Sequence, residues 1–135
     1  MNRVAVMVMM SAMMFSSLLA EGVQWRSWEA GLKEAKASNK IVMIDTVRTG
    51  CHYCDDMEEQ VFKDAAMAAY IDKRFVPVKI NLSKEALPLD LDVVMTPTFF
   101  FISKEGKLIK IVRGSWNRED FRSFLDGVKK EEEQR

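Results

Sequence analysis

The sequence predicts an α/β domain with a central mixed β-sheet flanked by helices. Segments with apolar residues at helical spacing alternate with short runs of β-branched and aromatic residues. Two of these runs enclose helical segments and form a βαβ unit, and the last two form a β-hairpin followed by a C-terminal helix. The chain has 135 residues, of which 48% are apolar, so it has room for one globular domain with one core.

The first twenty residues differ in composition from the rest of the chain. Arg3 is their only charged residue, six of the ten methionines lie among them, and the stretch ends on Ala20. A basic start, an apolar middle and a small residue at the end are typical of a secretory signal peptide. We therefore expect residues 1–20 to be a signal peptide and 21–135 to be the domain. An uncleaved membrane anchor is the alternative, and both interpretations place the domain outside the cytoplasm, in the periplasm.

Apolar side chains recur at helical spacing near the start of the domain, at Trp25, Trp28, Leu32 and Ala35. They predict a helix over about 26–38, for which Ser27 is a suitable N-cap. The next run, Ile41 to Val47, is rich in β-branched residues, and only Asp45 and Thr46 interrupt its apolar character. Its length and composition suit a strand buried on both faces, which favours a parallel or mixed sheet.

The crossover of the βαβ unit contains two predicted helices, one beginning at Cys51 and one at about Asp64. Phe75 to Asn81 is the second predicted strand, and the crossover requires it to run parallel to Ile41–Val47. Pro77 has no N–H group to donate to a neighbouring strand. We therefore expect this strand to lie at an edge of the sheet or to contain a bulge.

Thr98 to Ser103 and Leu108 to Arg113 are two β-rich runs joined by a turn that contains a glycine, which predicts a hairpin. The last helix begins at about Arg118, with Asn117 as its N-cap. The mixed-charge end from Lys129 is expected to be solvated and frayed. The stretch between the second strand and the hairpin, residues 82–95, is left without an assigned element.

Charge composition narrows the classes of partner. Twenty Lys and Arg residues balance twenty Asp and Glu residues, and the sequence has no basic stripe with interleaved aromatic residues. Nucleic acid is therefore not an expected partner. Membrane contact is expected only through an uncleaved N-terminal segment.

The two cysteines form the motif Cys51-His52-Tyr53-Cys54 at the start of a predicted helix. The free N–H groups and the positive dipole end of a helix N-terminus stabilise a thiolate and lower the pKa of the thiol there. Cys51 occupies that position, so we expect it to be the attacking nucleophile. Cys54 lies one turn further in and is expected to be the more buried, resolving thiol.

Other uses of two cysteines fit the sequence less well. A disulfide that closes a four-residue loop stabilises a fold by roughly 2 kcal/mol at most. A zinc site needs four ligands, and haem attachment needs a histidine after the second cysteine, where this chain has Asp55. We therefore predict a redox role, with neither a metal nor another cofactor.

The two residues between the cysteines are expected to modulate the site. A protonated His52 favours the thiolate and makes the disulfide more oxidising; a solvent-facing residue without effect is the alternative. Tyr53 is expected to shape the contact surface beside the disulfide and, with Trp116, to rim a shallow apolar groove there.

The motif and four further positions resemble the thioredoxin superfamily over nearly all of the domain. Asp45 stands six residues before the first cysteine, where thioredoxins keep a buried acid, and Lys79-Ile80-Asn81 is similar to their strand end with a lysine near that acid. Thr96-Pro97-Thr98 is similar to the segment whose cis-proline faces the disulfide, and Gly114 to the glycine after the last strand. The start of the domain is most similar to secreted thioredoxin-like reductases of bacteria. The resemblance implies a thioredoxin fold and thiol–disulfide exchange.

The resemblance also assigns expected roles. A buried Asp45 has a raised pKa and exchanges a proton with Cys54; an acid that reaches solvent at the rim of the sheet is the alternative. Lys79 is either its partner or a surface charge. A cis bond before Pro97 leaves the backbone of Thr96 free to bind an extended substrate. A trans proline entering a strand is the alternative.

Departures from the family pattern limit what is implied. No tryptophan precedes the first cysteine, and the inner dipeptide is His-Tyr instead of Gly-Pro, so a general thioredoxin is not implied. A tyrosine before the second cysteine and a threonine before the proline are similar to periplasmic Dsb-type isomerases and reductases. No dimerisation domain accompanies them, so isomerase activity is not implied.

The sequence therefore predicts an extracytoplasmic thiol–disulfide oxidoreductase that reduces protein disulfides. By resemblance, its electron donor is a membrane-bound thiol reductase. A disulfide-forming oxidant is one alternative. A non-catalytic binding module that uses the groove at Thr96 and Pro97 is the other.

Overall fold

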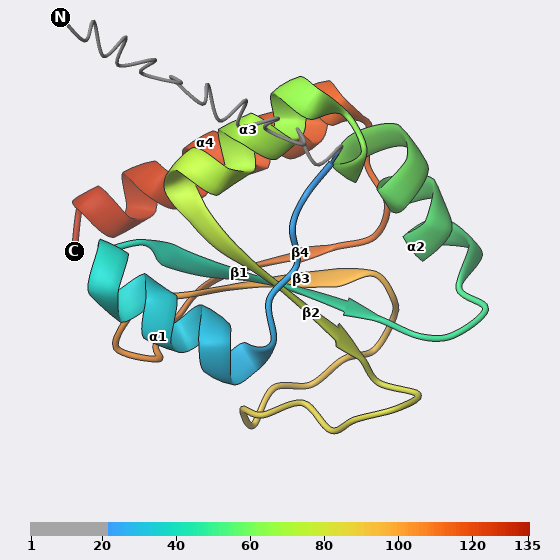
Figure 1. The fold of residues 1–135 in the computed structure, drawn as a ribbon, viewed down its shortest axis with the longest axis horizontal. Helices are drawn as coiled ribbons and strands as arrows, with labels where there is room; N and C mark the ends of the chain where they lie inside the picture. The colour runs from blue at the N-terminus through green and yellow to red at the C-terminus, as the bar shows by residue number, and fades with distance from the viewer. Residues whose placement is uncertain (1–21) are drawn as a thin grey trace, which may run out of the picture.

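The computed structural model describes residues 22–135, so the predicted signal peptide lies outside the described residues. A four-stranded mixed sheet with the order β2-β1-β3-β4 forms the centre of this part of the chain. Helix α1 lies on one side of the sheet, and α3 and α4 lie on the other (Figure 1). The predicted α/β class and element order are confirmed. Among the described residues no helix is long and apolar enough to cross a bilayer.

The central strand β1 (Ile41–Val47) pairs in parallel with β2 (Phe75–Asn81), as the βαβ unit requires. The crossover consists of α2 (His52–Met57), η1 (Glu58–Phe62) and α3 (Ala65–Arg74). Element η1 is a π-helical turn that continues α2, and the sequence pattern does not predict it. The expected edge position of the proline-containing strand is confirmed, because β2 ends the strand order.

The hairpin consists of β3 (Thr98–Ile102) and β4 (Leu108–Arg113), and β3 pairs antiparallel with β1. Helix α4 (Arg118–Glu133) follows, capped by Asn117. The expectation of a frayed end from Lys129 is wrong, because α4 continues to Glu133. Two ion pairs support this last part of the helix, Lys110 with Glu131 at 2.9 Å and Lys129 with Glu133 at 3.8 Å.

Strands β1, β2 and β3 are buried on both faces because the two faces carry separate apolar clusters. On one face Met43 and Phe99 pack with η1, α3 and α4. Five phenylalanines of this cluster pack edge to face in two groups: Phe62, Phe99 and Phe121 together, and Phe75 against Phe101. On the other face Val42 and Ile44 pack with α1. This double burial explains the nearly continuous apolar character of β1.

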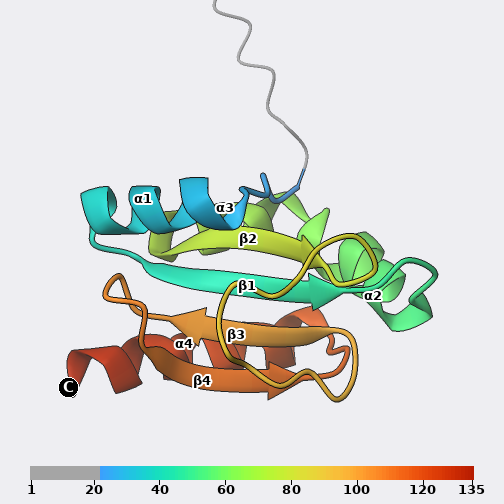
Figure 2. The same cartoon turned by 90° about the horizontal axis from the view of Figure 1, so that it is seen from below.

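The stretch that the sequence analysis left unassigned completes the cover of the second face. Residues 82–95 contain no helix or strand, and Figure 2 shows them crossing the strands near the end of the sheet where α2 begins. Their apolar side chains alternate with exposed ones and pack on the cluster of Val42 and Ile44, namely Leu87, Leu89, Leu91 and Val93. The segment therefore takes the place of a helix in covering this part of the core.

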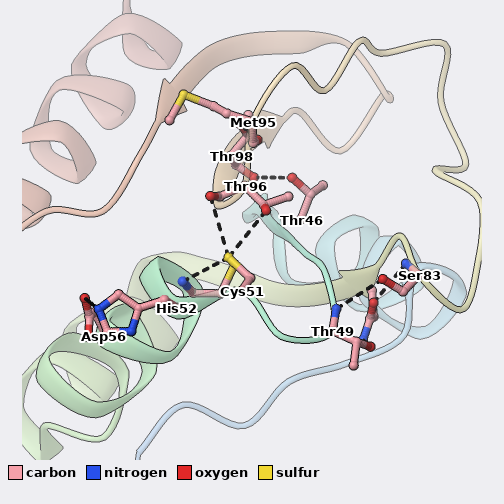
Figure 3. The surroundings of a disulfide bond; sticks show 11 residues. Thr46, Thr49, Cys51, His52, Asp56, Ser83, Met95, Thr96 and Thr98 are labelled. Carbon is pink, nitrogen blue, oxygen red and sulfur yellow. Dashed lines mark hydrogen bonds and ion pairs between the residues drawn. A yellow bond between two sulfur atoms is a disulfide. The ribbon is translucent and has the colours of Figure 1, made fainter.

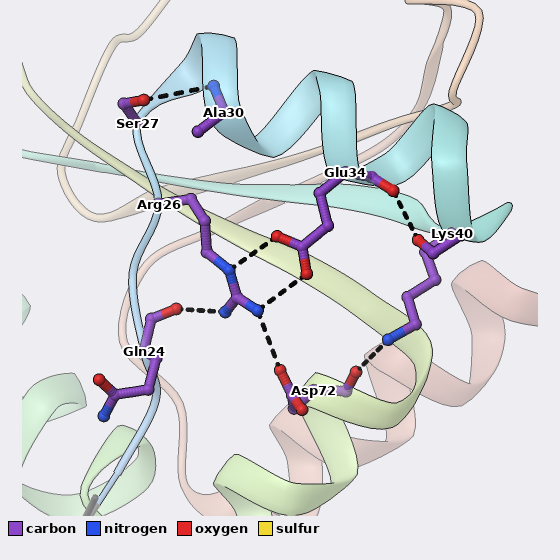
Figure 4. A network of polar contacts seen from close by, with 8 residues as sticks. Gln24, Arg26, Ser27, Ala30, Glu34, Lys40 and Asp72 are labelled. Carbon is purple, nitrogen blue, oxygen red and sulfur yellow. Dashed lines mark hydrogen bonds and ion pairs between the residues drawn. The ribbon is translucent and has the colours of Figure 1, made fainter.

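Helix α1 (Trp28–Ser38) is capped by Ser27 and lies against β2. Arg26, just before it, donates hydrogen bonds to both carboxylate oxygens of Glu34, at 3.0 Å each, and to Asp72 of α3 at 3.3 Å (Figure 4). Its backbone N–H donates to the carbonyl oxygen of Pro77 at 3.0 Å. Arg26 thus joins the start of α1 to α3 and covers part of the outer edge of β2.

The close approach of α1 to β2 yields a stability prediction for Gly31. A Cβ atom there would lie 2.3 Å from Val78 Cγ2, a core side chain, so Gly31→Ala is expected to destabilise the domain by about 1–3 kcal/mol. Gly127→Ala is the matched control in α4, where the Cβ would meet only the flexible end of Lys110 at 3.5 Å. This control is expected to be neutral or stabilising by up to about 1 kcal/mol. Urea denaturation of both variants measures the difference, and equal midpoints would contradict the packing argument.

Candidate active site

The two cysteines form a disulfide at the carboxyl end of the central strand. A short turn leads from β1 to Cys51, which is the N-cap of α2. The backbone N–H of Cys54 donates a hydrogen bond to Cys51 Sγ at 3.2 Å. Since η1 continues α2 to Phe62, this sulfur lies at the N-terminal end of a helical stretch of two successive elements.

The segment before β3 brings a second set of polar atoms to the same sulfur. The Thr96 hydroxyl donates to Cys51 Sγ at 3.4 Å, and the Thr96 carbonyl oxygen lies 3.6 Å from it (Figure 3). The peptide bond between Thr96 and Pro97 is cis, the isomer that the sequence analysis expects. Although 45 positions separate Thr96 from Cys51 in the sequence, the fold places them in contact.

Three hydrogen bonds hold this segment in place. The buried Thr46 hydroxyl on β1 donates to the carbonyl oxygen of Thr98 at 2.7 Å, and the Thr98 hydroxyl donates to that of Met95 at 2.7 Å. From the other side, the N–H of Gly114 donates to the Pro97 carbonyl oxygen at 2.9 Å. Gly114 has a φ of 92°, in the left-handed region that favours glycine, which explains the residue type after β4.

The turn before Cys51 is tied to the end of β2. The Thr49 N–H donates to Ser83 Oγ at 3.1 Å (Figure 3). The Asn81 amide donates to Thr49 Oγ1 at 3.1 Å. Gly50 follows with a φ of 73° and open space where a Cβ would be. The first cysteine is therefore positioned by β1, by β2 and by the segment before β3.

The two cysteines are less exposed to solvent than the two residues between them. Cys51 and Cys54 are both half-buried, so the expected greater depth of Cys54 is not visible at the level of whole residues. His52 and Tyr53 are exposed, with 81% of the His52 side chain accessible. His52 Nε2 lies 3.4 Å from Asp56 Oδ2, one turn further along α2, and the Tyr53 ring packs edge-on to the imidazole.

Asp45 is buried, with 2% of its surface exposed, so the solvated alternative is wrong. Burial raises the pKa of Asp45 to about 7; the positive charge of Lys79 lowers it and the negative charge of Glu58 raises it, both by less than burial does. No described group donates a hydrogen bond to Asp45 Oδ1. Lys79, its neighbour across the ladder, forms its ion pair with Glu58 at 2.8 Å. No sequence pattern predicts Glu58 as the partner of Lys79.

A shallow groove of about 280 Å³ adjoins the disulfide, and it is lined by Tyr53, Asp56, Met95, Thr96, Gly114 and Ser115. Tyr53 and Thr96 are predicted site residues, whereas Met95 and Asp56 are not. Trp116, which the sequence places near this groove, is not among its lining residues; its indole N–H donates to the Arg113 carbonyl oxygen at 2.9 Å. Between residues 22 and 135 no group of His, Cys, Asp and Glu side chains is arranged to hold a metal ion.

Comparison with known proteins agrees with this geometry. Residues 28–129 match the family model described as a thioredoxin-like domain. The chain belongs to the thioredoxin-like family. With its Cys-x-x-Cys pair present, this thioredoxin-like protein is a thiol–disulfide oxidoreductase.

Thioredoxin H4 of Arabidopsis thaliana is 30% identical over 98 residues, which cover 73% of this chain and 79% of that protein. A candidate disulphide-isomerase from Bacteroides thetaiotaomicron has a TM-score of 0.70 at 25% identity, over 81% of this chain and 94% of that chain. DsbH oxidoreductase has a TM-score of 0.64 at 17% identity, over 88% and 90%, and this likeness concerns the fold alone.

Two matched relatives are much longer proteins. The matched part covers 8% of an uncharacterized protein of Caenorhabditis elegans and 9% of human Spermatogenesis-associated protein 20. These two matches therefore concern one domain of each relative.

The burial of Asp45 yields a prediction for stability against pH. The unfolded chain loses this proton near pH 3.8 and the folded protein near pH 7, so the folded state binds more protons in between and its stability falls as pH rises through this window. The difference of about three pH units corresponds to a loss of about 4 kcal/mol at most.

Asp45→Asn is expected to remove this fall, because asparagine stays neutral at every pH. Asp90→Asn, at an exposed position of the same charge type, is the control and is expected to keep it. Urea denaturation of the oxidised proteins from pH 4 to pH 8 measures both. An unchanged pH dependence in Asp45→Asn would show that another group is responsible.

Proposed function

We propose that this thioredoxin-like protein is an extracytoplasmic reductase of protein disulfides, in which Cys51 attacks and Cys54 resolves. The observation that carries the proposal is the position of Cys51 Sγ at the N-cap of α2, where it accepts two hydrogen bonds beside an open groove. Both donors, the Cys54 N–H and the Thr96 hydroxyl, stabilise negative charge on this sulfur. A thiolate at this position is the nucleophile that disulfide exchange requires.

The exchange consists of two steps that move two electrons to the client. The Cys51 thiolate attacks one sulfur of the client disulfide, so that a mixed disulfide forms and the other client sulfur leaves as a thiolate, which takes up a proton. Cys54 then loses its proton and attacks Cys51 Sγ. The mixed disulfide breaks, the second client thiol is released, and the Cys51–Cys54 disulfide of the present structure is formed.

Asp45 is proposed to be the proton acceptor for Cys54 in the second step. It lies on the sheet face that η1 covers, and burial brings the pKa of its carboxyl to about 7. An acid with a pKa near the working pH both accepts and returns a proton readily. When the disulfide is reduced again, the same carboxyl returns the proton to Cys54.

The groove beside the disulfide is proposed to hold an extended segment of the client. Tyr53 and Met95 offer exposed apolar surface, with 61% and 44% of each residue accessible, and Thr96 lines the same groove and contacts Cys51 Sγ. The backbone of Thr96 and Pro97 then aligns a client strand against Cys51. In this arrangement His52 and Tyr53 modulate the site from its exposed side.

The proposals for the location of the protein and for its electron donor are based on the sequence of residues 1–20 rather than on the structure of the domain. The apolar stretch 1–20 supports export to the periplasm, with or without cleavage. Outside the cytoplasm a reductase needs a source of electrons that crosses the membrane, and a membrane-bound thiol reductase meets this need. Protein disulfides are the proposed substrates, and no cofactor is required for the exchange.

The assignment of the two cysteines is tested by titrating single thiols. In Cys54→Ser the Cys51 thiolate, followed by its ultraviolet absorbance, is expected to form well below the ordinary pKa of about 8.5. The same variant should accumulate a mixed disulfide with a disulfide-bonded peptide. Cys51→Ser is the matched control and should do neither. A low pKa at Cys54 instead would reverse the roles.

The direction of electron flow is tested by the reduction potential of the Cys51–Cys54 couple, measured against glutathione. The reduction potential of a reductase is expected to be about −270 mV, whereas that of a disulfide-forming oxidant is about −120 mV. Partner binding that survives Cys51→Ser, without any exchange in the unaltered protein, would instead identify a non-catalytic binding module.

A further inference from the structure

A charged pair, Lys79 with Glu58, lies near the buried Asp45, and the function proposed above uses only Asp45. Lys79 is the direct neighbour of Asp45 across the β1–β2 ladder. Its ammonium nevertheless pairs with Glu58, with 2.8 Å between Nζ and Oε2. Asp45 Oδ1 remains without a hydrogen-bond partner among the described residues. The cation next to the buried acid is thus engaged elsewhere.

Two elements hold the Lys79 ammonium where it is. Glu58 begins η1 directly after the buried Met57, and only 34% of its side chain is exposed. From the segment before α1, the Trp25 ring lies with its centroid 4.3 Å from Lys79 Nζ, a cation–π contact. The Trp25 ring is itself fixed edge-on against Phe62, with 5.0 Å between ring centroids.

Glu58 acts on the charge of Asp45 in two ways, and both favour the protonated carboxyl. A free ammonium beside a buried carboxyl favours its ionised form, and the charge of Lys79 does lower the pKa of Asp45; pairing with Glu58 weakens that influence. The carboxylate of Glu58 also opposes a second negative charge nearby. Of the elements packed on this face, β3 presents the apolar Phe99 next to Asp45, so Lys79 on β2 and Glu58 on η1 are the charged groups that face it.

We propose that Glu58 is a positioning residue which, with Trp25, holds the Lys79 ammonium away from the Asp45 carboxyl. Asp45 therefore keeps its proton in the oxidised protein. The inference rests on the proposed function, because a protonated Asp45 is the state that regeneration needs. The donor thiolate forms a bond with Cys51 Sγ, the Cys51–Cys54 bond breaks, and its electron pair stays on Cys54. The proton that neutralises Cys54 comes from Asp45.

The test follows the Asp45 carboxyl directly in the oxidised protein, by carbon NMR of aspartate labelled at Cγ and assigned with Asp45→Asn. In Glu58→Gln the titration midpoint of Asp45 is expected to fall by about one pH unit, a tenfold loss of proton affinity. Glu59→Gln is the matched control. Glu59 is the next residue of η1, it is exposed, and it pairs with Lys63 instead. This control should leave the midpoint unchanged.

The role of the ammonium is tested by removing it. Lys79→Gln is expected to raise the Asp45 midpoint, and Glu58→Gln added to Lys79→Gln should lower it far less than Glu58→Gln does alone. Trp25→Leu should lower the midpoint in the same direction as Glu58→Gln, whereas Trp25→Phe, which keeps an aromatic face, should lower it less. An unchanged midpoint in Glu58→Gln overturns the proposal. A fall of equal size without Lys79 also overturns it, because Glu58 would then act by its own charge.

Activity distinguishes this inference from the function on which it rests. If Asp45 serves Cys54, the pH profile of disulfide regeneration should move with the midpoint in Glu58→Gln, and Glu58→Gln should have no effect on the profile in Asp45→Asn. A midpoint that moves while the profile does not supports the positioning of Lys79 and refutes the proton transfer. The titration therefore tests the positioning of Lys79, and the kinetics test the proton transfer from Asp45 to Cys54.

Discussion

The geometry of the site depends on one hydrogen bond, which the Thr46 hydroxyl donates to the Thr98 carbonyl oxygen. It stands at the last pair of the β1–β3 ladder, and both residues are fully buried. β1 delivers the disulfide at its carboxyl end, and β3 begins directly after the segment that carries Thr96 and Pro97. Because these two strands are antiparallel neighbours, the last residues of β1 and the first residues of β3 lie at the same end of the sheet (Figures 1 and 3). A displacement at this pair would separate the sulfur from the Thr96 hydroxyl.

The same burial that stabilises the fold sets the chemistry of the site. Asp45 shares its sheet face with Met43 and with the phenylalanine cluster, in which packed aromatic rings exclude water. In such surroundings an unpaired carboxylate is costly, so the carboxyl holds its proton to a much higher pH than in water. The core thus provides stability through apolar contacts and, at one position, an acid suited to proton exchange near neutral pH.

Much of the fold follows from local patterns. The bounds of β1, β2 and β4, and the N-caps of α1, α3 and α4, agree with the predicted ones, because β-branched runs and capping residues act over a few positions. The cover of the second sheet face by residues 82–95 was not predicted, although its alternating leucines carry a signal. Alternation of period two indicates an extended chain with one face buried, and here that chain packs on the sheet without joining it.

The sequence by itself determined the Cys-x-x-Cys pair and its place at a helix N-terminus, since both are specified by residue type and short spacing. The resemblance to thioredoxins, and not a local pattern, pointed to Asp45 and to the Thr96-Pro97 segment. Only the tertiary structure decided which of these groups interact. Lys79 forms its ion pair with Glu58 rather than with Asp45, and Met95 rather than Trp116 lines the groove. Both outcomes depend on how η1, β2 and the loops pack together. No local pattern encodes those distances, because the residues concerned come from separate elements that the folded sheet brings together.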